Sequence, residues 1–202
     1  MINEVIFDVE TKKLFSDISG TNPADLGVSV VSVYTRSLDD NLQEVEGEIK
    51  SFWEDNFKNM WQLFQNADRI IGFNSKNFDI PALSPYTNFP FSKLPHFDLF
   101  EIVYNEVGRR IGLNALAEIT LNVRKSGEGV QAVELWNKGD TKSLEKLRKY
   151  CELDVIITKD LYDFGIREKF LMYKDKWNNK RKVEIDFSHT HNKEVTPQQS
   201  LF

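Results

Sequence analysis

The chain has 202 residues, of which 41% are hydrophobic and 28% charged, enough to bury one sizeable core in a globular domain. No stretch approaches the roughly 20 apolar residues of a membrane-spanning helix, no signal-peptide pattern opens the chain, and a single cysteine excludes an internal disulfide framework, so we expect a cytoplasmic protein without a membrane partner. The net charge of −5 argues against a nucleic-acid partner, unless acidic side chains hold cations.

The first predicted elements are strands. Residues 4–10 are apolar apart from their acids, residues 26–34 are rich in valine, and residues 44–50 indicate a third, shorter strand. A helix is predicted to follow, because apolar side chains recur there on one face at steps of three and four residues: Trp53, Phe57, Met60, Trp61 and Phe64. The first third of the chain therefore contributes most of the sheet.

The middle of the chain mixes short strands with helices, and the last part is mostly helical. Strands are predicted at residues 69–73 and 94–97. Helices are predicted at residues 98–107, 113–120, 131–137 and 141–165. We expect one α/β domain over residues 1–187, followed by a flexible polar tail over residues 188–202.

Two acidic residues stand out in the first strand. Asp8 and Glu10 are two positions apart, so their side chains project from one face of the strand, while Val5, Phe7 and Val9 point to the other. Two carboxylates side by side on a buried strand repel each other and are costly to desolvate. A divalent cation relieves both effects, so the pair predicts a metal site, provided that the chain supplies further ligands.

A third acid follows the strand at residues 69–73. Asp79 lies in the connection from that strand to a helical turn that contains Pro81, and such connections often carry functional groups. Its position just before Pro81 also suits a helix N-cap. A purely structural role as a cap is therefore the alternative for Asp79.

Tyr150 and Asp154 lie on the long predicted helix. They are four residues apart and thus neighbours on one face. Asp154 falls within the stripe that the apolar spacing marks as buried, which includes Leu147, Cys151, Val155, Thr158 and Leu161. An unpaired charge is unfavourable there, so Asp154 is either a metal ligand or the salt-bridge partner of a buried Lys or Arg.

In this order, these residues resemble the motifs of the DEDD 3′–5′ exonucleases. The motifs read Asp8-x-Glu10, Asn74-x-x-x-Phe78-Asp79 and Tyr150-x-x-x-Asp154, and the tyrosine marks the tyrosine subclass. Residues 97–154 further resemble the branch related to the proofreading exonuclease domains of family B DNA polymerases. The resemblance covers about residues 4–165 and implies a ribonuclease-H-like α/β fold with a mixed five-stranded sheet flanked by helices.

The resemblance also implies a mechanism. Four carboxylates, from Asp8, Glu10, Asp79 and Asp154, would hold two divalent cations, Mg²⁺ or Mn²⁺, with Asp8 bridging both. Tyr150 would orient the attacking water, since its phenol is a poor base at neutral pH. The expected activity is two-metal-ion hydrolysis that releases nucleoside monophosphates from the 3′ end of DNA, at single-stranded or frayed ends.

Four further residues are predicted to contact the substrate. Asn74 would hydrogen-bond near the terminal nucleotide, Thr11 would reach the 3′-hydroxyl, Phe78 would pack on a base, and Lys125 would contact a phosphate. Structural roles are the alternatives for Thr11 and for Phe78, the latter as a core residue.

The C-terminal residues suggest a partner. The chain ends Gln198-Gln199-Ser200-Leu201-Phe202, which is similar to the short peptide by which bacterial replication proteins bind the sliding clamp. Gln198, Leu201 and Phe202 are the predicted contacts, because an exposed polar tail ending in Leu-Phe presents an apolar anchor. A tail without this function is the alternative.

Two other functions are open at this point. One is an RNA 3′-end-processing exonuclease, because the same motifs serve both polymers, and RNA is then the partner. The other is a non-catalytic nucleic-acid-binding module that retains the fold. The presence of all four carboxylates and of Tyr150 argues against the second.

Overall fold

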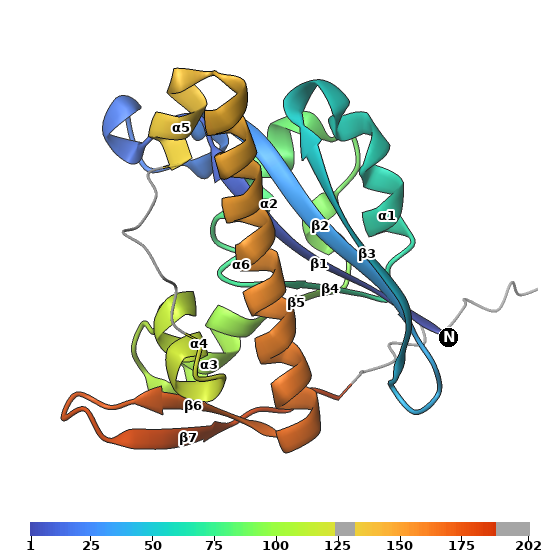
Figure 1. Ribbon diagram of the computed structural model, residues 1–202, viewed down its shortest axis with the longest axis vertical. Coiled ribbons are helices and arrows are strands. Elements are labelled where there is room, and N and C mark those ends of the chain that lie inside the picture. The colour runs from blue at the N-terminus through green and yellow to red at the C-terminus, as the bar shows by residue number, and fades with distance from the viewer. Residues whose placement is uncertain (124–131, 189–202) are drawn as a thin grey trace, which may run out of the picture.

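The structure is a computed structural model that describes residues 1–123 and 132–188. A five-stranded sheet with the order β3-β2-β1-β4-β5 forms its centre, and a two-stranded sheet lies apart from it (Figure 1). The central strands are β1 (Ile2–Thr11), β2 (Val28–Leu38), β3 (Glu44–Trp53), β4 (Arg69–Gly72) and β5 (His96–Asp98). The first three strands pair antiparallel and the last two join in parallel, which confirms the predicted mixed sheet.

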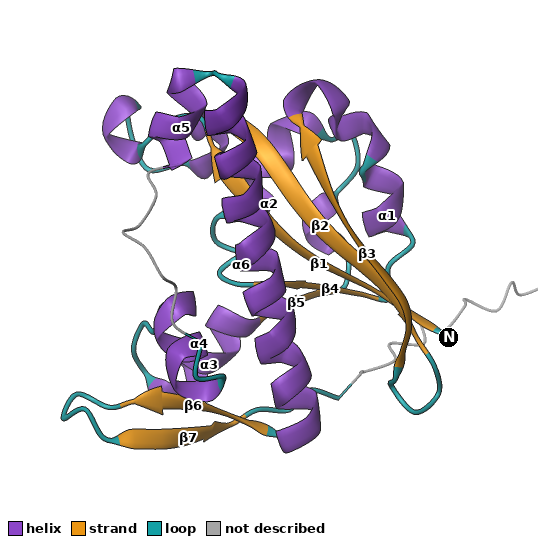
Figure 2. Cartoon of the chain, in the orientation of Figure 1, coloured by secondary structure: helices purple, strands orange, loops and turns teal. Residues whose placement is uncertain are grey.

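Helices cover the sheet, and the longest of them crosses one face from end to end (Figure 2). The α-helices are α1 (Trp61–Gln65), α2 (Asp79–Leu83), α3 (Leu99–Val107), α4 (Leu113–Thr120), α5 (Ala132–Lys138) and α6 (Thr141–Glu168). The small sheet is a hairpin of β6 (Phe170–Lys174) and β7 (Lys180–Glu184). Within the described part of the chain, no helix is long and apolar enough to cross a membrane.

Alternating side chains of β1 belong to two different cores, as the sequence predicts. Val5, Phe7 and Val9 pack in one cluster of buried residues, whereas Ile6 packs in another with residues of α6 such as Val155. The even-numbered side chains of β1 therefore face α6. Asp8 and Glu10 lie on that face, between the central strand and the long helix.

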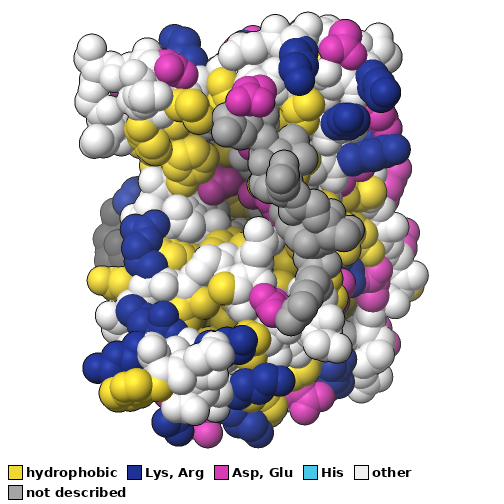
Figure 3. All heavy atoms as spheres, turned by 60° about the vertical axis from the view of Figure 1, so that its left-hand side comes forward, with side chains coloured by type: hydrophobic (Ala, Val, Ile, Leu, Met, Phe, Trp, Pro, Cys, Tyr) yellow, Lys and Arg dark blue, Asp and Glu magenta, His cyan; other side chains and the backbone are white. Residues whose placement is uncertain are grey.

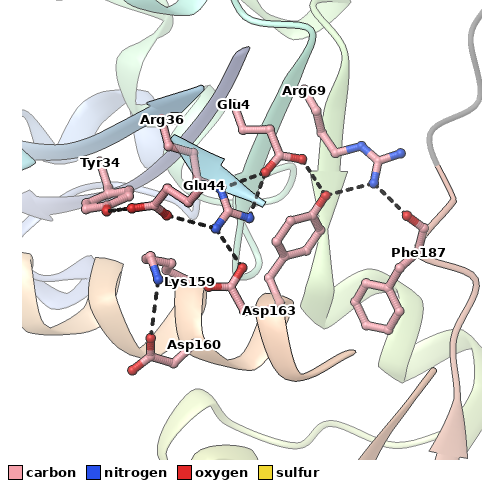
Figure 4. Close-up of polar contacts among 10 residues, drawn as sticks. Glu4, Tyr34, Arg36, Glu44, Arg69, Lys159, Asp160, Asp163 and Phe187 are labelled. Carbon is pink, nitrogen blue, oxygen red and sulfur yellow. Dashed lines mark hydrogen bonds and ion pairs between the residues drawn. The ribbon is translucent and has the colours of Figure 1, made fainter. Parts of the chain in front are cut away.

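A buried polar network fixes α6 against the sheet (Figure 4). On β1, Glu4 accepts hydrogen bonds from Arg36 Nε of β2 at 2.9 Å and from the Tyr162 hydroxyl of α6 at 2.7 Å. Arg69 of β4 donates to the Tyr162 oxygen at 2.9 Å, and Arg36 also pairs with Asp163 of α6 at 2.7 Å. Charged side chains this well buried are stable only when paired, so the network ties three strands and the helix into one arrangement.

This network also sets the register of α6 along β1. Asp8 lies four residues beyond Glu4, which is roughly 13 Å along a strand. Asp154 lies eight residues before Tyr162, which is roughly 12 Å along a helix. Because α6 runs antiparallel to β1, the Glu4–Tyr162 contact at one end places Asp154 beside Asp8 at the other.

Two sequence predictions are wrong between residues 44 and 65. The third strand is not short, because β3 has ten residues and its pairing with β2 extends to Trp53 opposite Val30. The segment that follows is not one amphipathic α-helix but a 3₁₀ helix at Glu54–Asn59 followed by α1. Asp and Asn side chains in the 3₁₀ segment compete for the backbone and disfavour a continuous α-helix.

The β6–β7 hairpin was not predicted. The sequence there indicates a cluster of basic residues around Trp177, at residues 174–182, which is a candidate for phosphate contacts but carries no strand signal. Leu171 and Val183 are its most buried residues, and much of the rest of the ribbon is charged. A strand with one buried residue among lysines carries little of the alternation by which strands are recognised.

Replacing Arg36 by Met should strongly destabilise the fold, because Glu4 would lose its guanidinium partner in a buried site. We expect the free energy of unfolding to fall by about 3–5 kcal/mol, measured by urea denaturation. The matched control is Arg167→Met, whose exposed side chain pairs with Glu168 at the surface and should contribute less than about 1 kcal/mol. Similar losses in the two variants would contradict a structural role for the network.

Candidate metal centre

Three carboxylates from two elements meet between β1 and α6. Asp8, Glu10 and Asp154 each offer an oxygen atom, and these atoms all lie within 4.8 Å of one another. All three residues are half-buried. Strand alternation places the first two, and the register of α6 places the third. The grouping that the sequence suggests is therefore present in the fold.

Asp79 comes close to Asp8 because β1 and β4 separate after Ile6. The two strands pair only over Glu4 to Ile6, so the amide of Val9 has no partner on β4. Asp79 Oδ1 accepts a hydrogen bond from that amide at 3.1 Å. Asp79 is the first residue of α2, and the N-cap residue before it makes no side-chain cap. The carboxylate thus faces β1, and the reading of Asp79 as an N-cap is wrong.

Asp8 is the electrostatic centre of the cluster. Burial raises the pKa of its carboxyl well above its usual value, and the charges of Asp79, Glu10 and Asp154 raise it further. Burial likewise raises the pKa of Asp79 to about 7, and the charge of Asp98 adds to this shift. These shifts measure how unfavourable the negative charges are at this point, which is the condition that a cation relieves.

Two further α6 side chains border Asp8. The Cys151 thiol lies 3.4 Å from the Asp8 carbonyl oxygen and 3.5 Å from Asp8 Oδ2. Burial raises the pKa of Cys151, so the thiol is neutral. Burial and the charges of Asp154, Glu10 and Asp8 also raise the pKa of Tyr150, so its phenol keeps its proton. Cys151 is a neighbour that the sequence assigned only to the core.

Asp98 organises the connection that carries Asp79, a role that the sequence reading missed. Its fully buried carboxylate caps α3 by accepting from the amide of Phe100 at 3.0 Å. It also accepts from the amides of Asn74 and Lys76, at 2.8 and 2.9 Å. An Asp directly before a helix is the sequence signal of such a cap. The hydrogen bonds of Asp98 to the β4–α2 connection have no local sequence signal.

A cavity of about 590 Å³ adjoins the Asp79 connection. Asn74 and Phe78 line it, together with exposed aromatic side chains from two other segments. Phe15 lies edge-on to Phe78, with ring centroids 6.1 Å apart, and Phe100 is stacked on Tyr104 at 6.1 Å. Phe78 also packs against the core, which agrees with its alternative role as a core residue.

Thr11, Lys125 and the residues of the tail complete the predicted substrate and partner contacts. Thr11 is buried, and its hydroxyl donates to the carbonyl of Lys13 at 3.0 Å, which supports its structural alternative. Lys125 lies outside the described residues, as do all three predicted contacts of the tail: Gln198, Leu201 and Phe202.

The donor set fits a hard divalent cation. Carboxylate oxygens are the ligands that Mg²⁺ and Mn²⁺ prefer, whereas the neighbouring thiol is neutral and is a poor ligand in that state. Figure 3 shows acidic side chains at the bottom of a hollow on one face of the molecule, with basic side chains beside and below it. The acidic triad can therefore bind divalent metal ions.

Comparisons with known proteins agree with this geometry. A family model described as the RNase_H superfamily matches residues 5–165. A family B DNA polymerase from the hyperthermophilic archaeon Pyrobaculum calidifontis is similar in structure, with a TM-score of 0.58 and 20% sequence identity over 82% of this chain. The match spans 25% of the polymerase chain, so the likeness concerns the fold of one part of it. A search of curated proteins gives no match.

Asp8→Asn should stabilise the metal-free protein and abolish its response to metal. The variant removes a charge that is desolvated and repelled, so in EDTA we expect unfolding to require about 1–3 kcal/mol more than in the wild type. Mg²⁺ or Mn²⁺ should raise the melting temperature of the wild type and leave that of the variant unchanged. The control is Asp40→Asn, an exposed residue between β2 and β3. A metal response that survives in Asp8→Asn would refute the assignment.

The pKa of Asp79 predicts an unusual pH dependence in EDTA. Between about pH 4 and 7 the folded state binds a proton at Asp79 that the unfolded state has lost, so this residue contributes stability at low pH that disappears as the pH rises through 7. Asp79→Asn carries no such titration. We expect its stability relative to the wild type to increase by about 1–4 kcal/mol across that window, measured by urea denaturation at each pH. A difference that is constant with pH would contradict the shift.

Proposed function

We propose that this chain, which belongs to the RNase_H superfamily, is a metal-dependent 3′–5′ exonuclease that acts on DNA. The observation that carries the proposal is the convergence of Asp8, Glu10 and Asp154 within 4.8 Å. Members of this superfamily are typically phosphodiester hydrolases, and clustered carboxylates suit the cations that such hydrolysis uses.

The carboxylates divide into two sets around Asp8. Glu10 and Asp154 lie on one side with it, and Asp79 approaches from the β4–α2 connection. Asp8, Glu10 and Asp154 would hold one divalent ion, and Asp8 together with Asp79 would hold a second. When bound, two such ions stabilise the attacking and leaving oxygens of an in-line phosphoryl displacement.

Tyr150 has a positioning role in this proposal. Its raised pKa keeps the phenol protonated at neutral pH, so it donates a hydrogen bond and does not act as a base. The acids that raise its pKa, Asp154, Glu10 and Asp8, are the triad itself, so the phenol lies at the edge of the centre. A donor at that position orients the attacking water toward the phosphorus.

The aromatic cavity next to Asp79 suits the terminal nucleotides. The unpaired bases of a single strand stack on aromatic side chains, and Phe15, Phe78 and Tyr104 line this cavity. The side-chain amide of Asn74 supplies a hydrogen-bonding group in the same cavity. We favour DNA over RNA as the substrate because the polymerase that shares the fold is a DNA polymerase.

The test is stepwise shortening of a 5′-labelled single-stranded DNA oligonucleotide with Mg²⁺ or Mn²⁺, resolved by gel electrophoresis. Wild-type protein should produce a ladder, and Asp8→Ala and Asp154→Ala should abolish it, because each removes a ligand of the cation centre. Tyr150→Phe should slow it by about 10²-fold, since the water is less well oriented. Asp160→Ala, an exposed acid on the same helix, is the control and should retain full activity.

Each of the other outcomes has a defined meaning. Activity that persists in both Asp8→Ala and Asp154→Ala would refute the metal mechanism. Faster shortening of the matching RNA would reassign the substrate to RNA. Equal inactivity of wild type and variants on both polymers, together with oligonucleotide binding, would replace the nuclease by a binding module.

A further inference from the structure

The β6–β7 hairpin has one apolar and one basic face. Leu171 and Val183 are directly paired and buried, and they belong to the core that contains α6. On the opposite face, Lys174 pairs directly with Lys180, and Lys182 follows two residues later. The hairpin thus covers the core with one side and presents lysines with the other.

The charge on this ribbon is concentrated. Residues 170–184 contain five basic and two acidic side chains, a local charge of +3 in a chain whose net charge is −5. One of the two acids, Glu184, follows Lys182 on the same face at the end of β7. Like charges directly opposite each other in an antiparallel pair are destabilising, and Lys174 and Lys180 occupy such a pair. Arg109 adds a further charge from the α3–α4 connection, because its guanidinium donates to the Lys174 carbonyl. An anionic partner relieves this repulsion.

The turn of the hairpin carries an exposed aromatic ring on a backbone that hydrogen bonds define. Asp175 accepts hydrogen bonds from the amides of Trp177 and Asn179, both at 2.9 Å, and from Arg181 Nε at 3.0 Å. These bonds define the turn, yet Trp177 is 69% exposed. A large aromatic ring exposed to water among lysines offers a stacking surface. The Lys176 Nζ atom lies 4.4 Å from the centroid of the Trp177 ring.

The hairpin is anchored to the helical part of the domain. The Thr120 hydroxyl at the end of α4 donates to the Met172 carbonyl and accepts from the Met172 amide, both at 2.9 Å. After β7, the amide of Ile185 donates to the carbonyl of Lys169 at 3.2 Å. The strands that carry the basic side chains are therefore held in a defined orientation on the domain.

We infer that the β6–β7 hairpin is a docking arm for single-stranded nucleic acid. Lys174, Lys180 and Lys182 contact the phosphates, and Trp177 stacks on an unpaired base. Figure 3 shows basic side chains at the lower end of the face that contains the acidic hollow, the end at which Figure 1 places the hairpin. The inference rests on the proposed function in one respect, that the strand held by the arm is the strand whose end reaches the metal centre.

The test measures binding of a fluorescein-labelled single-stranded DNA oligonucleotide by anisotropy, in EDTA and at several salt concentrations. Lys180→Glu combined with Lys182→Glu should weaken binding at least about tenfold and reduce the slope of log K against log salt by roughly 1.4, because two phosphate contacts are lost. Trp177→Ala should weaken binding of the single strand by about 5- to 150-fold and affect a duplex of the same sequence less.

The matched control reverses two exposed lysines on the β3 side of the molecule, Lys50→Glu with Lys58→Glu, and changes the net charge by the same amount. This control should bind nearly as the wild type does. Equal affinities in the hairpin variant and the control would overturn the inference, because only total charge would then matter. Wild-type protein that binds vesicles containing phosphatidylserine but not the oligonucleotide would also overturn it.

The measurement separates this inference from the proposed function, because no hydrolysis occurs in EDTA. Wild-type protein that binds through the hairpin but never shortens DNA would support the arm and contradict the exonuclease. Protein that shortens DNA, with hairpin variants that bind as tightly as the control, would contradict the arm alone.

Discussion

The alignment of α6 along one face of β1 is the constraint on which the rest of the structure depends. The same face of β1 carries the buried acid Glu4 and the half-buried acid Asp8, which differ in their surroundings. Glu4 meets Arg36 and the Tyr162 hydroxyl, so its charge is matched within the protein. Asp8 meets other acids and a neutral thiol, and its pKa rises accordingly. Like charges placed together at one point of the central strand favour a bound cation there, and the chain belongs to the RNase_H superfamily.

The contacts of Glu4 stabilise the surroundings of Asp8. The network around Glu4 holds α6 in one register along β1, and that register brings Asp154 to Asp8. Because β1 diverges from β4, the Val9 amide has no strand partner and donates to the Asp79 carboxylate. The need of this N–H group for an acceptor therefore brings the fourth carboxylate to β1. The geometry of the site therefore depends both on the buried network around Glu4 and on the contact between Asp79 and the Val9 amide.

Much of the sheet and the acidic site was predictable, because both follow from local rules. Alternation placed Asp8 and Glu10 on one face, and helical spacing placed Asp154 toward the sheet. Contacts between segments that are distant in the sequence could not be predicted. The capture of the Val9 amide by Asp79 depends on where two strands separate, and the reach of Asp98 depends on two connections lying side by side. The β6–β7 hairpin was missed because its exposed lysines hide the alternation of its strands.

The most direct test of the central claim is anomalous diffraction from crystals soaked in Mn²⁺. The account predicts anomalous peaks in contact with the carboxylate oxygens of Asp8, with Glu10 and Asp154 beside one ion and Asp79 beside the other. Crystals of Asp8→Ala grown and soaked in the same way should show no peak at this position. Saturating Mn²⁺ that gives peaks only elsewhere on the protein, with none at Asp8, would contradict the account.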